Sequence, residues 1–151
     1  MGVEPFLLAS TLAMVVAQRL VRLICVSCRE SIEIRPEIVE MLSRQTDFPA
    51  SLRALRAQGM LGSAPEDLRG VRLFQGNGCR QCGGSGYRGR IGLFEILEVD
   101  EEIRRMMLDR RDAASIRATA IQRGMKTMFQ DGLAKILLGQ TTAEELVRVT
   151  T

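Results

Sequence analysis

The sequence contains no histidine and no tryptophan, and it has only one tyrosine among its 151 residues. Without histidine the chain cannot form a Ser-His-Asp triad, a histidine general base or a mixed Cys-His metal site. The shortage of aromatic residues also argues against a nucleic-acid-binding zinc ribbon, which needs basic and aromatic side chains on one β-face. The soft ligands that remain are four cysteines.

A large excess of one charge is absent as well. The 21 basic and 18 acidic residues leave a net charge of +3 and are interleaved along the chain, so charge gives no reason to expect nucleic-acid binding. The length and the 46% hydrophobic content predict about one folded domain with a modest core.

Long hydrophobic runs are absent too. The apolar opening, residues 6–17, covers 12 residues before Gln18 and Arg19 interrupt it, whereas a membrane-spanning helix needs about 20. A signal peptide would begin with basic residues, but Glu4 is the only charged residue ahead of this stretch. We therefore expect a cytoplasmic chain.

The four cysteines form two C-x-x-C pairs, Cys25 with Cys28 and Cys79 with Cys82, separated by 50 residues. In a reducing compartment such pairs are not expected to be structural disulfides. The two-residue spacing places both thiolates of a pair on one side of a turn, within reach of one ion at a zinc–sulfur distance of about 2.3 Å. The sequence therefore predicts a closed, structural Zn²⁺ site with these four ligands.

Redox dithiols and an iron–sulfur centre are the alternatives for the cysteines. A thioredoxin-like C-x-x-C normally accompanies a βαβ pattern, and none is visible here. No catalytic residue is predicted, because Glu101/Glu102 and Glu144/Glu145 occupy positions where the first turn of a helix favours negative charge. The stretch Gly124-Met125-Lys126-Thr127 is not a P-loop, since Ala120 and Met125 stand where glycines are required.

The chain pattern predicts a mixture of helices and strands. Residues 15–23 contain β-branched residues with partial alternation, so strand and helix compete there. Asp100 and Asp112 are expected to cap helices, the first of them ending at Arg110 and Arg111. The other expected elements are a helix from Pro5, helices over 36–42 and 51–58, a loop over 59–70, strands over 71–74 and 90–97, a helix over 129–137 that stops at Gly139, and a last helix opened by a capping box at 141–144.

Several segments of the chain together carry a resemblance to one known family. They are residues 1–10, 17–22 with the first cysteine pair, 78–97, 131–135, 139–142 and 144–150. These segments resemble the region that follows the nucleotide site in the type II secretion and type IV pilus assembly ATPases, including its second cysteine knuckle. Only residues 43–70 are longer than the resemblance leads us to expect.

The resemblance implies an α+β fold that is mostly α, in which residues 18–20 and 90–97 are edge strands of a truncated RecA-like sheet. It implies the end of an ATPase core over 1–24, a tetracysteine zinc-binding module over 25–89, a returning strand over 90–99 and a C-terminal helical subdomain over 100–151.

The function implied by the resemblance is that of a cytoplasmic hexameric ATPase, which powers secretion or pilus assembly through inner-membrane platform proteins. ATP and Mg²⁺ would bind to parts of such a protein that lie upstream, so we expect a fragment that is not an enzyme on its own and has no nucleic-acid partner or membrane span. Arg19, Arg88 and Arg90 are candidate contacts to nucleotide or a neighbouring subunit, against the alternative of solvated or locally paired guanidiniums. The alternative function is a DnaJ-like zinc-binding chaperone module, because residues 79–86 resemble one C-x-x-C-x-G-x-G repeat of that family.

Overall fold

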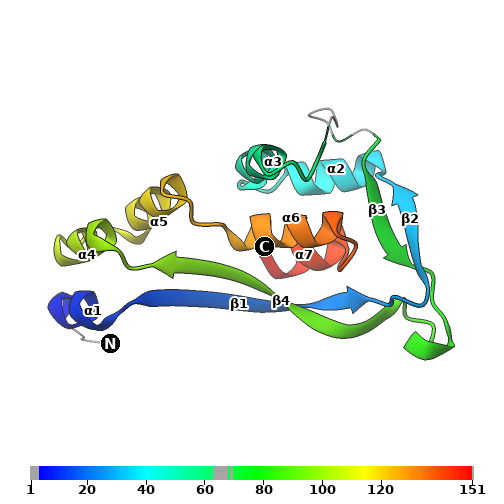
Figure 1. The fold of residues 1–151 in the computed structure, drawn as a ribbon, viewed down its shortest axis with the longest axis horizontal. Coiled ribbons are helices and arrows are strands. Elements are labelled where there is room, and N and C mark those ends of the chain that lie inside the picture. The colour runs from blue at the N-terminus through cyan, green and yellow to red at the C-terminus, as the bar shows by residue number, and fades with distance from the viewer. Residues whose placement is uncertain (1–3, 63–67, 69, 151) are drawn as a thin grey trace. The chain divides into compact units, whose positions relative to one another are not determined.

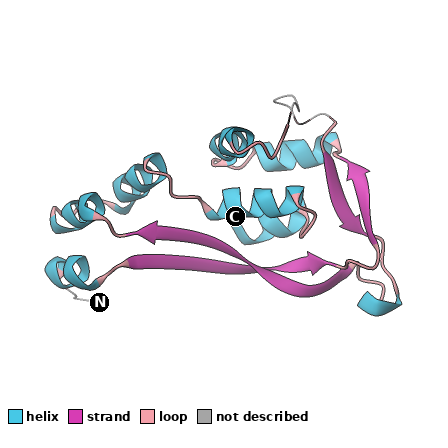
Figure 2. Ribbon diagram, viewed as in Figure 1, coloured by secondary structure: helices cyan, strands magenta, loops and turns pink. Residues whose placement is uncertain are grey.

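A computed structural model describes residues 4–62, 68 and 70–150 of the chain (Figure 1). These residues form seven α-helices, one 3-10 turn and four strands (Figure 2). In chain order the elements are α1 (Pro5–Thr11), β1 (Met14–Ile24), β2 (Arg29–Glu33), α2 (Pro36–Ser43), α3 (Phe48–Ala57), β3 (Arg72–Gly76), η1 (Arg80–Cys82), β4 (Tyr87–Glu98), α4 (Glu101–Leu108), α5 (Ala113–Gln122), α6 (Met128–Leu137) and α7 (Ala143–Thr150). The mixed, mainly helical composition confirms the predicted fold class at this level.

The strands form two antiparallel pairs rather than one larger sheet within the described residues. β2 pairs with β3 in a register that runs from Arg29 opposite Gly76 to Glu33 opposite Arg72. β1 pairs with β4. The backbone N–H of Cys25 donates to Gly86 O at one end of that pair and Val99 N–H donates to Ala13 O at the other, so these strands also run in opposite directions.

The chain divides into two compact units. The first comprises Met1–Ala17 and Phe94–Thr127, and the second comprises Gln18–Leu93 and Met128–Thr151. β1 and β4 therefore each contribute residues to both units. The predicted boundaries of the zinc module and the helical subdomain remain predictions.

The first unit packs α4 against α1 and α5. Its buried centre consists of Val99, Ile103 and Ala120. The carboxylate of Asp100 accepts from Ile103 N–H at 3.0 Å, and that of Asp112 accepts from Ser115 N–H at 2.9 Å. Both predicted N-caps are thus confirmed, and they start α4 and α5 where local sequence placed them.

The second unit is built around α6, which contacts α3, α7 and β3. Side chains from all its layers meet in one core, including Val21 and Leu93 from the long strands and Leu133 and Leu146 from the last two helices. Gly132 permits close packing of α6 on α7, because a Cβ at this position would lie 2.3 Å from Leu146 Cδ1. The core thereby joins β1 and β4, which lead to and from the cysteines, to the C-terminal helices.

Most elements lie near where the sequence predicted them, but β2 (Arg29–Glu33) was not predicted, and several element ends differ. Residues 15–23, for which strand and helix competed, are strand. α3 begins at Phe48, not Ser51, because Pro49 is accepted in the first helical turn. α4 ends at Leu108, before Arg110 and Arg111, and Arg110 has a positive φ of 54° that a helix cannot continue through.

Two further predictions concern segment ends. The loop predicted over 59–70 lies partly outside the described residues. α7 begins at Ala143, so Thr142 rather than Thr141 precedes its first turn. Among the residues that the structure describes, no helix combines the length and the apolar character that a membrane crossing demands.

Candidate metal centre

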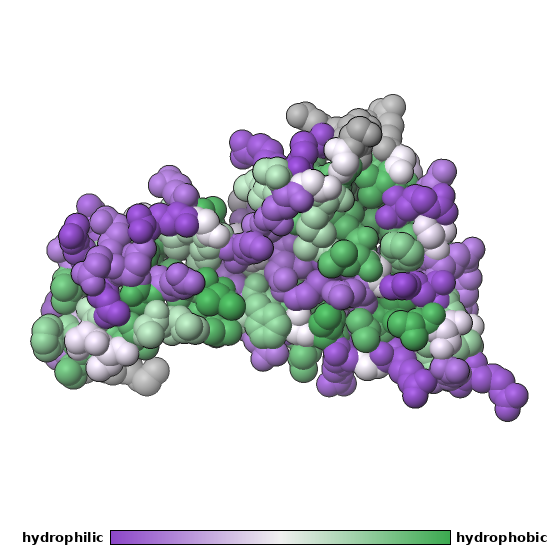
Figure 3. All heavy atoms as spheres, in the orientation of Figure 1, coloured by the Kyte–Doolittle hydropathy of each residue, from purple (hydrophilic) through white to green (hydrophobic). Residues whose placement is uncertain are grey.

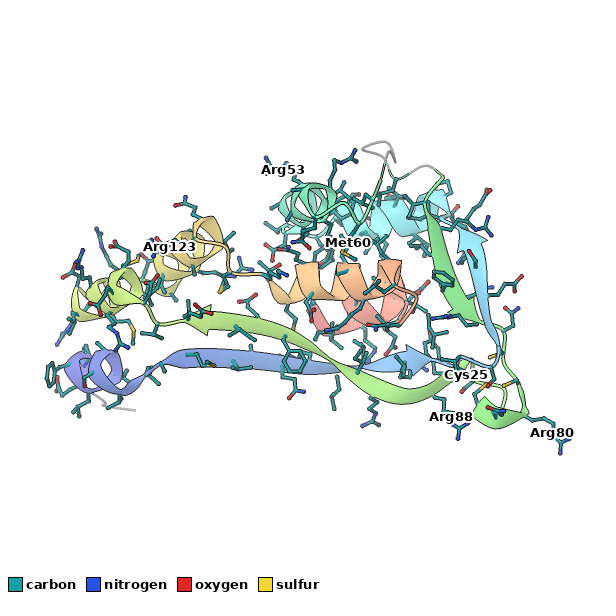
Figure 4. The ribbon with its side chains drawn as sticks, in the orientation of Figure 1. Cys25, Arg53, Met60, Arg80, Arg88 and Arg123 are labelled. Atoms are coloured by element: carbon teal, nitrogen blue, oxygen red, sulfur yellow. The ribbon has the colours of Figure 1, made fainter. Side chains whose placement is uncertain are left out.

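The four cysteines converge at one end of the second unit, near the label of Cys25 in Figure 4. Cys25 follows β1, Cys28 precedes β2, Cys79 follows β3, and Cys82 ends η1 just before β4. Their four sulfur atoms all lie within 4.8 Å of one another. Two hairpin-like knuckles, 50 residues apart in sequence, therefore form one cluster, as their spacing predicted.

The sulfur separations match a tetrahedral metal site. Cys25 Sγ lies 3.9 Å from Cys79 Sγ, and Cys28 Sγ lies 3.9 Å from Cys82 Sγ. Within the second knuckle Cys79 Sγ and Cys82 Sγ are 3.7 Å apart. A tetrahedron with metal–sulfur bonds of about 2.3 Å has edges of about 3.8 Å. The cluster has the size and the donor set for one ion held by four thiolates.

Backbone donors surround the sulfur of Cys82. The N–H of Cys79 donates to it at 3.1 Å and the N–H of Gly86 at 3.3 Å. These donors, the Cys79 N–H above all, lower the pKa of Cys82 to about 6 against the effect of burial. Loss of hydration raises the pKa of Cys28 to about 12, and coordination to a cation would be needed to hold that sulfur as a thiolate.

Glycines allow the two sides of the second knuckle to meet. A Cβ on Gly76 would lie 2.0 Å from Gly86 O, and a Cβ on Gly78 would lie 2.5 Å from Gly84 O. Neither contact can be relieved by a side-chain rotation, because the obstructing atoms are backbone. The close approach of the chain at the end of β3 to the chain just before β4 therefore requires glycine at these positions.

A polar contact also joins the two knuckles outside the cluster. Gln81 Oε1 accepts from Ser27 Oγ at 2.6 Å and from Arg88 Nη1 at 3.2 Å. Arg88 is thus locally paired with the second knuckle, and Figure 4 shows both Arg80 and Arg88 at the outer end of the unit, directed away from its helices. This pairing fits the alternative that the sequence left open for Arg88.

The three arginines proposed from sequence are not brought together in one site. Arg19 is exposed on β1. Arg90 is exposed on β4 and lines a cavity of about 460 Å³ that Arg22 and Arg148 also line. Of the three, Arg90 is thus the one that this hollow brings beside other guanidinium groups.

Sequence reasoning missed the carboxylate in that hollow. Glu145 is only 2% exposed. Its oxygens accept from Arg22 backbone N–H and Nη2 at 2.8 and 2.9 Å, and from Arg148 Nε and Nη2 at 3.1 and 2.8 Å. Burial by itself would raise the pKa of Glu145, but the hydrogen bonds from Arg148 and Arg22 outweigh it and lower the pKa to about 2.

The sequence could have predicted only one of the two ion pairs of Glu145. The Glu145–Arg148 spacing of three residues is typical of a helical ion pair. Arg22 lies 123 residues away from Glu145, and no local pattern links them. The ring of Tyr87 further supports Arg22, whose Cζ lies 4.1 Å from the ring centroid.

Comparison with known proteins covers nearly the whole chain. Residues 1–148 match the family model described as "Type II/IV secretion system protein". The chain is 40% identical over 147 residues to the type IV pilus assembly ATPase PilB of Thermus thermophilus, covering 97% of this chain and 14% of that protein. It is 39% identical over 150 residues to type II secretion system protein E of Dickeya dadantii, covering 99% of this chain and 25% of that protein.

A more distant relative gives the same result. The type IV pilus assembly ATPase PilB of Myxococcus xanthus is 31% identical over 147 residues, which are 97% of this chain and 23% of that protein. The chain thus spans no more than about a quarter of the length of these relatives.

Proposed function

The chain belongs to the type II/IV secretion system protein family, and on this basis we propose that it is the zinc-binding region of an ATPase for type II secretion or type IV pilus assembly. The observation that carries the proposal is the four-sulfur cluster: all four atoms lie within 4.8 Å of one another, and three of the pairs, 3.7 to 3.9 Å apart, suit one tetrahedral ion. The family membership gives no support to a DnaJ-like chaperone module.

Zinc is the ion that best fits these ligands. Four thiolates in a tetrahedron favour Zn²⁺ or an iron–sulfur centre, and zinc is the usual occupant of Cys₄ knuckles. With all four positions taken by sulfur, no site remains for a water or a substrate, so the role is structural. Zinc binding would contribute on the order of 10 kcal/mol to the folding of a module whose ligands come from separate strands.

Metal analysis of the purified full chain tests this proposal. We expect about one zinc per chain and no appreciable iron, because one closed four-thiolate site holds one ion. The matched variant Cys79→Ser should lose most of the bound metal, whereas Ser27→Ala, in the first knuckle but not a ligand, should retain it. Zinc content near zero in a folded chain, or an iron stoichiometry with visible absorbance, would refute the zinc site.

The β1–β4 pair supports a second part of the proposal, that these strands are the edge of a larger RecA-like sheet. Val15 and Val16 on β1 are 45% and 51% exposed, and Phe94 and Ile96 on β4 are 37% and 45% exposed. These four residues belong to the first unit. Figure 3 shows hydrophobic atoms at the surface of that unit, where α1 and the start of β1 lie. Apolar strand residues at the surface are expected where a sheet continues into another part of a protein.

The catalytic activity of the relatives is proposed to lie outside this chain. The four cysteines have a structural role in this proposal, and the sequence offers no histidine and no P-loop. The chain would therefore not hydrolyse ATP alone. Within the complete protein it would act in a hexamer at the cytoplasmic face of the inner membrane, held there by platform proteins.

Arg90 is the strongest of the three arginines as a contact for nucleotide or a neighbouring subunit. It shares its cavity with Arg22 and Arg148, and the single carboxylate among the lining residues, Glu145, is already held by both. The hollow thus keeps a net positive charge, which suits an anionic group. Arg19 and Arg88 are retained as weaker candidates.

A further inference from the structure

The turn between α6 and α7, residues 139–142, contacts every chain segment that enters or leaves the cysteine cluster. On the first knuckle, Ile24 N–H, directly before Cys25, donates to Gln140 O at 2.9 Å. Arg29 Nη1, directly after Cys28, donates to Gly139 O at 3.2 Å. Both ends of this knuckle are therefore fastened to the same turn.

The second knuckle meets the same turn from its two ends. On the side before Cys79, the Phe74 ring lies against Gly139, so closely that a Cβ there would be 2.6 Å from Phe74 Cδ2. On the side after Cys82, Tyr87 OH lies 3.1 Å from Thr142 Oγ1. The turn thus contacts the chain segments before and after both knuckles, although it contributes no sulfur ligand itself.

The turn is itself tightly held. Thr141 is fully buried and its hydroxyl donates to Arg22 O at 2.9 Å. Thr142 is 8% exposed. The residues that follow in α7, Glu145 and Leu146, are 2% and 0% exposed, and Glu145 returns to Arg22 through two hydrogen bonds. Movement of β1 near Cys25 would therefore disturb the start of α7, and the reverse holds as well.

We propose that the α6–α7 turn is a positioning element of the metal centre, so that zinc affinity and the docking of α7 are energetically coupled. The inference rests on the proposed zinc site. The turn preorganises the two knuckles, which lowers the cost of bringing four sulfurs together. Coupling of this kind is reciprocal. If docking of α7 raises zinc affinity, then zinc binding stabilises the docked α7 by the same free energy.

The first arm of the test measures zinc affinity of the full chain by competition with a chromophoric chelator. Thr141→Val removes the buried hydroxyl that binds Arg22 O, and Tyr87→Phe removes only the hydroxyl at Thr142. Each should weaken zinc binding about five-fold, as expected for one lost hydrogen bond of about 1 kcal/mol. Thr150→Val is the matched control, because its hydroxyl bonds to Leu146 O within α7, at 3.0 Å.

The second arm measures hydrogen exchange with and without zinc. Removal of zinc should speed exchange of the α7 amides at least several-fold while leaving α5, in the other unit, unchanged. The coupling is refuted if Thr141→Val and Tyr87→Phe lower thermal stability but leave zinc affinity unchanged. It is also refuted if hydrogen exchange in α7 is the same with and without zinc. In both cases the proposed zinc site would stand. A chain that binds no zinc at all would overturn both proposals.

Discussion

At the scale of single residues, Glu145 shows how far the surroundings of a side chain can differ from what its neighbours in sequence predict. Local sequence identified it correctly as an acidic residue in the first turn of the last helix. Its burial and its pairing with Arg22 depend on strand β1, which arrives from the other end of the chain. A carboxylate this enclosed is stable only while both guanidinium partners are present.

Glu145→Gln should lower the free energy of unfolding by about 2 kcal/mol near neutral pH, because two charge-assisted interactions are lost from a buried position. The expected loss is modest because the Arg22 and Arg148 side chains are 54% and 56% exposed. Urea denaturation followed by circular dichroism measures the change. The control is Glu144→Gln, next in sequence but exposed, which should change stability by less than about 0.5 kcal/mol.

The acid dependence of stability follows from the same residue. The pKa of Glu145 is lowered to about 2 in the folded chain, and its unfolded reference is about 4.3. Its contribution is therefore complete above about pH 4.3 and is lost as the pH falls toward 2. Between these limits the wild type should lose more stability than Glu145→Gln, and equal slopes for the two proteins would contradict the assignment.

At the scale of elements, the second knuckle depends on the close approach of the end of β3 to the residues just before β4. Gly76→Ala should disrupt it, because the added Cβ would lie 2.0 Å from Gly86 O and only a backbone shift can relieve the overlap. We expect a loss of about 2 kcal/mol or more in stability and a marked drop in zinc affinity, measured by urea denaturation and chelator competition.

Gly89→Ala separates this effect from ordinary glycine strain. Gly89 has a positive φ of 85°, but a Cβ added there would meet no atom within 4 Å. Its substitution should cost about 1 kcal/mol in stability and leave zinc affinity nearly unchanged. Equal zinc affinities for Gly76→Ala and Gly89→Ala would show that the close approach of Gly76 to Gly86 does not shape the site.

Sequence predicted the elements well where the determining contacts are local. Asp100 and Asp112 cap their helices by accepting from the backbone N–H three positions ahead, so the local sequence is enough to predict where these helices begin. β1 was ambiguous because its pairing partner, β4, is distant and many of its residues are exposed. Cysteine spacing predicted which four residues form the cluster, yet it could not reveal the contacts from residues 139–142, which carry no signature of ligation.

At the scale of the whole molecule, the two units have separate buried centres. Ile103, 1% exposed, belongs to the cluster of the first unit, and Leu146, fully buried, belongs to that of the second. The four cysteines, the α6–α7 turn and α7 all fall in the second unit. Ligand binding stabilises only the cooperative unit that contains its site.

Calorimetry of the full chain should therefore resolve two unfolding transitions, of which only one responds to zinc. Leu146→Ala should lower the zinc-dependent transition and Ile103→Ala the other, since each removes about 2–5 kcal/mol of core stabilisation from its own unit. Both variants shorten one buried aliphatic side chain to alanine, so each serves as the control for the other. A single transition lowered by both substitutions and raised by zinc would mean that β1 and β4, which run through both units, join them into one cooperative body.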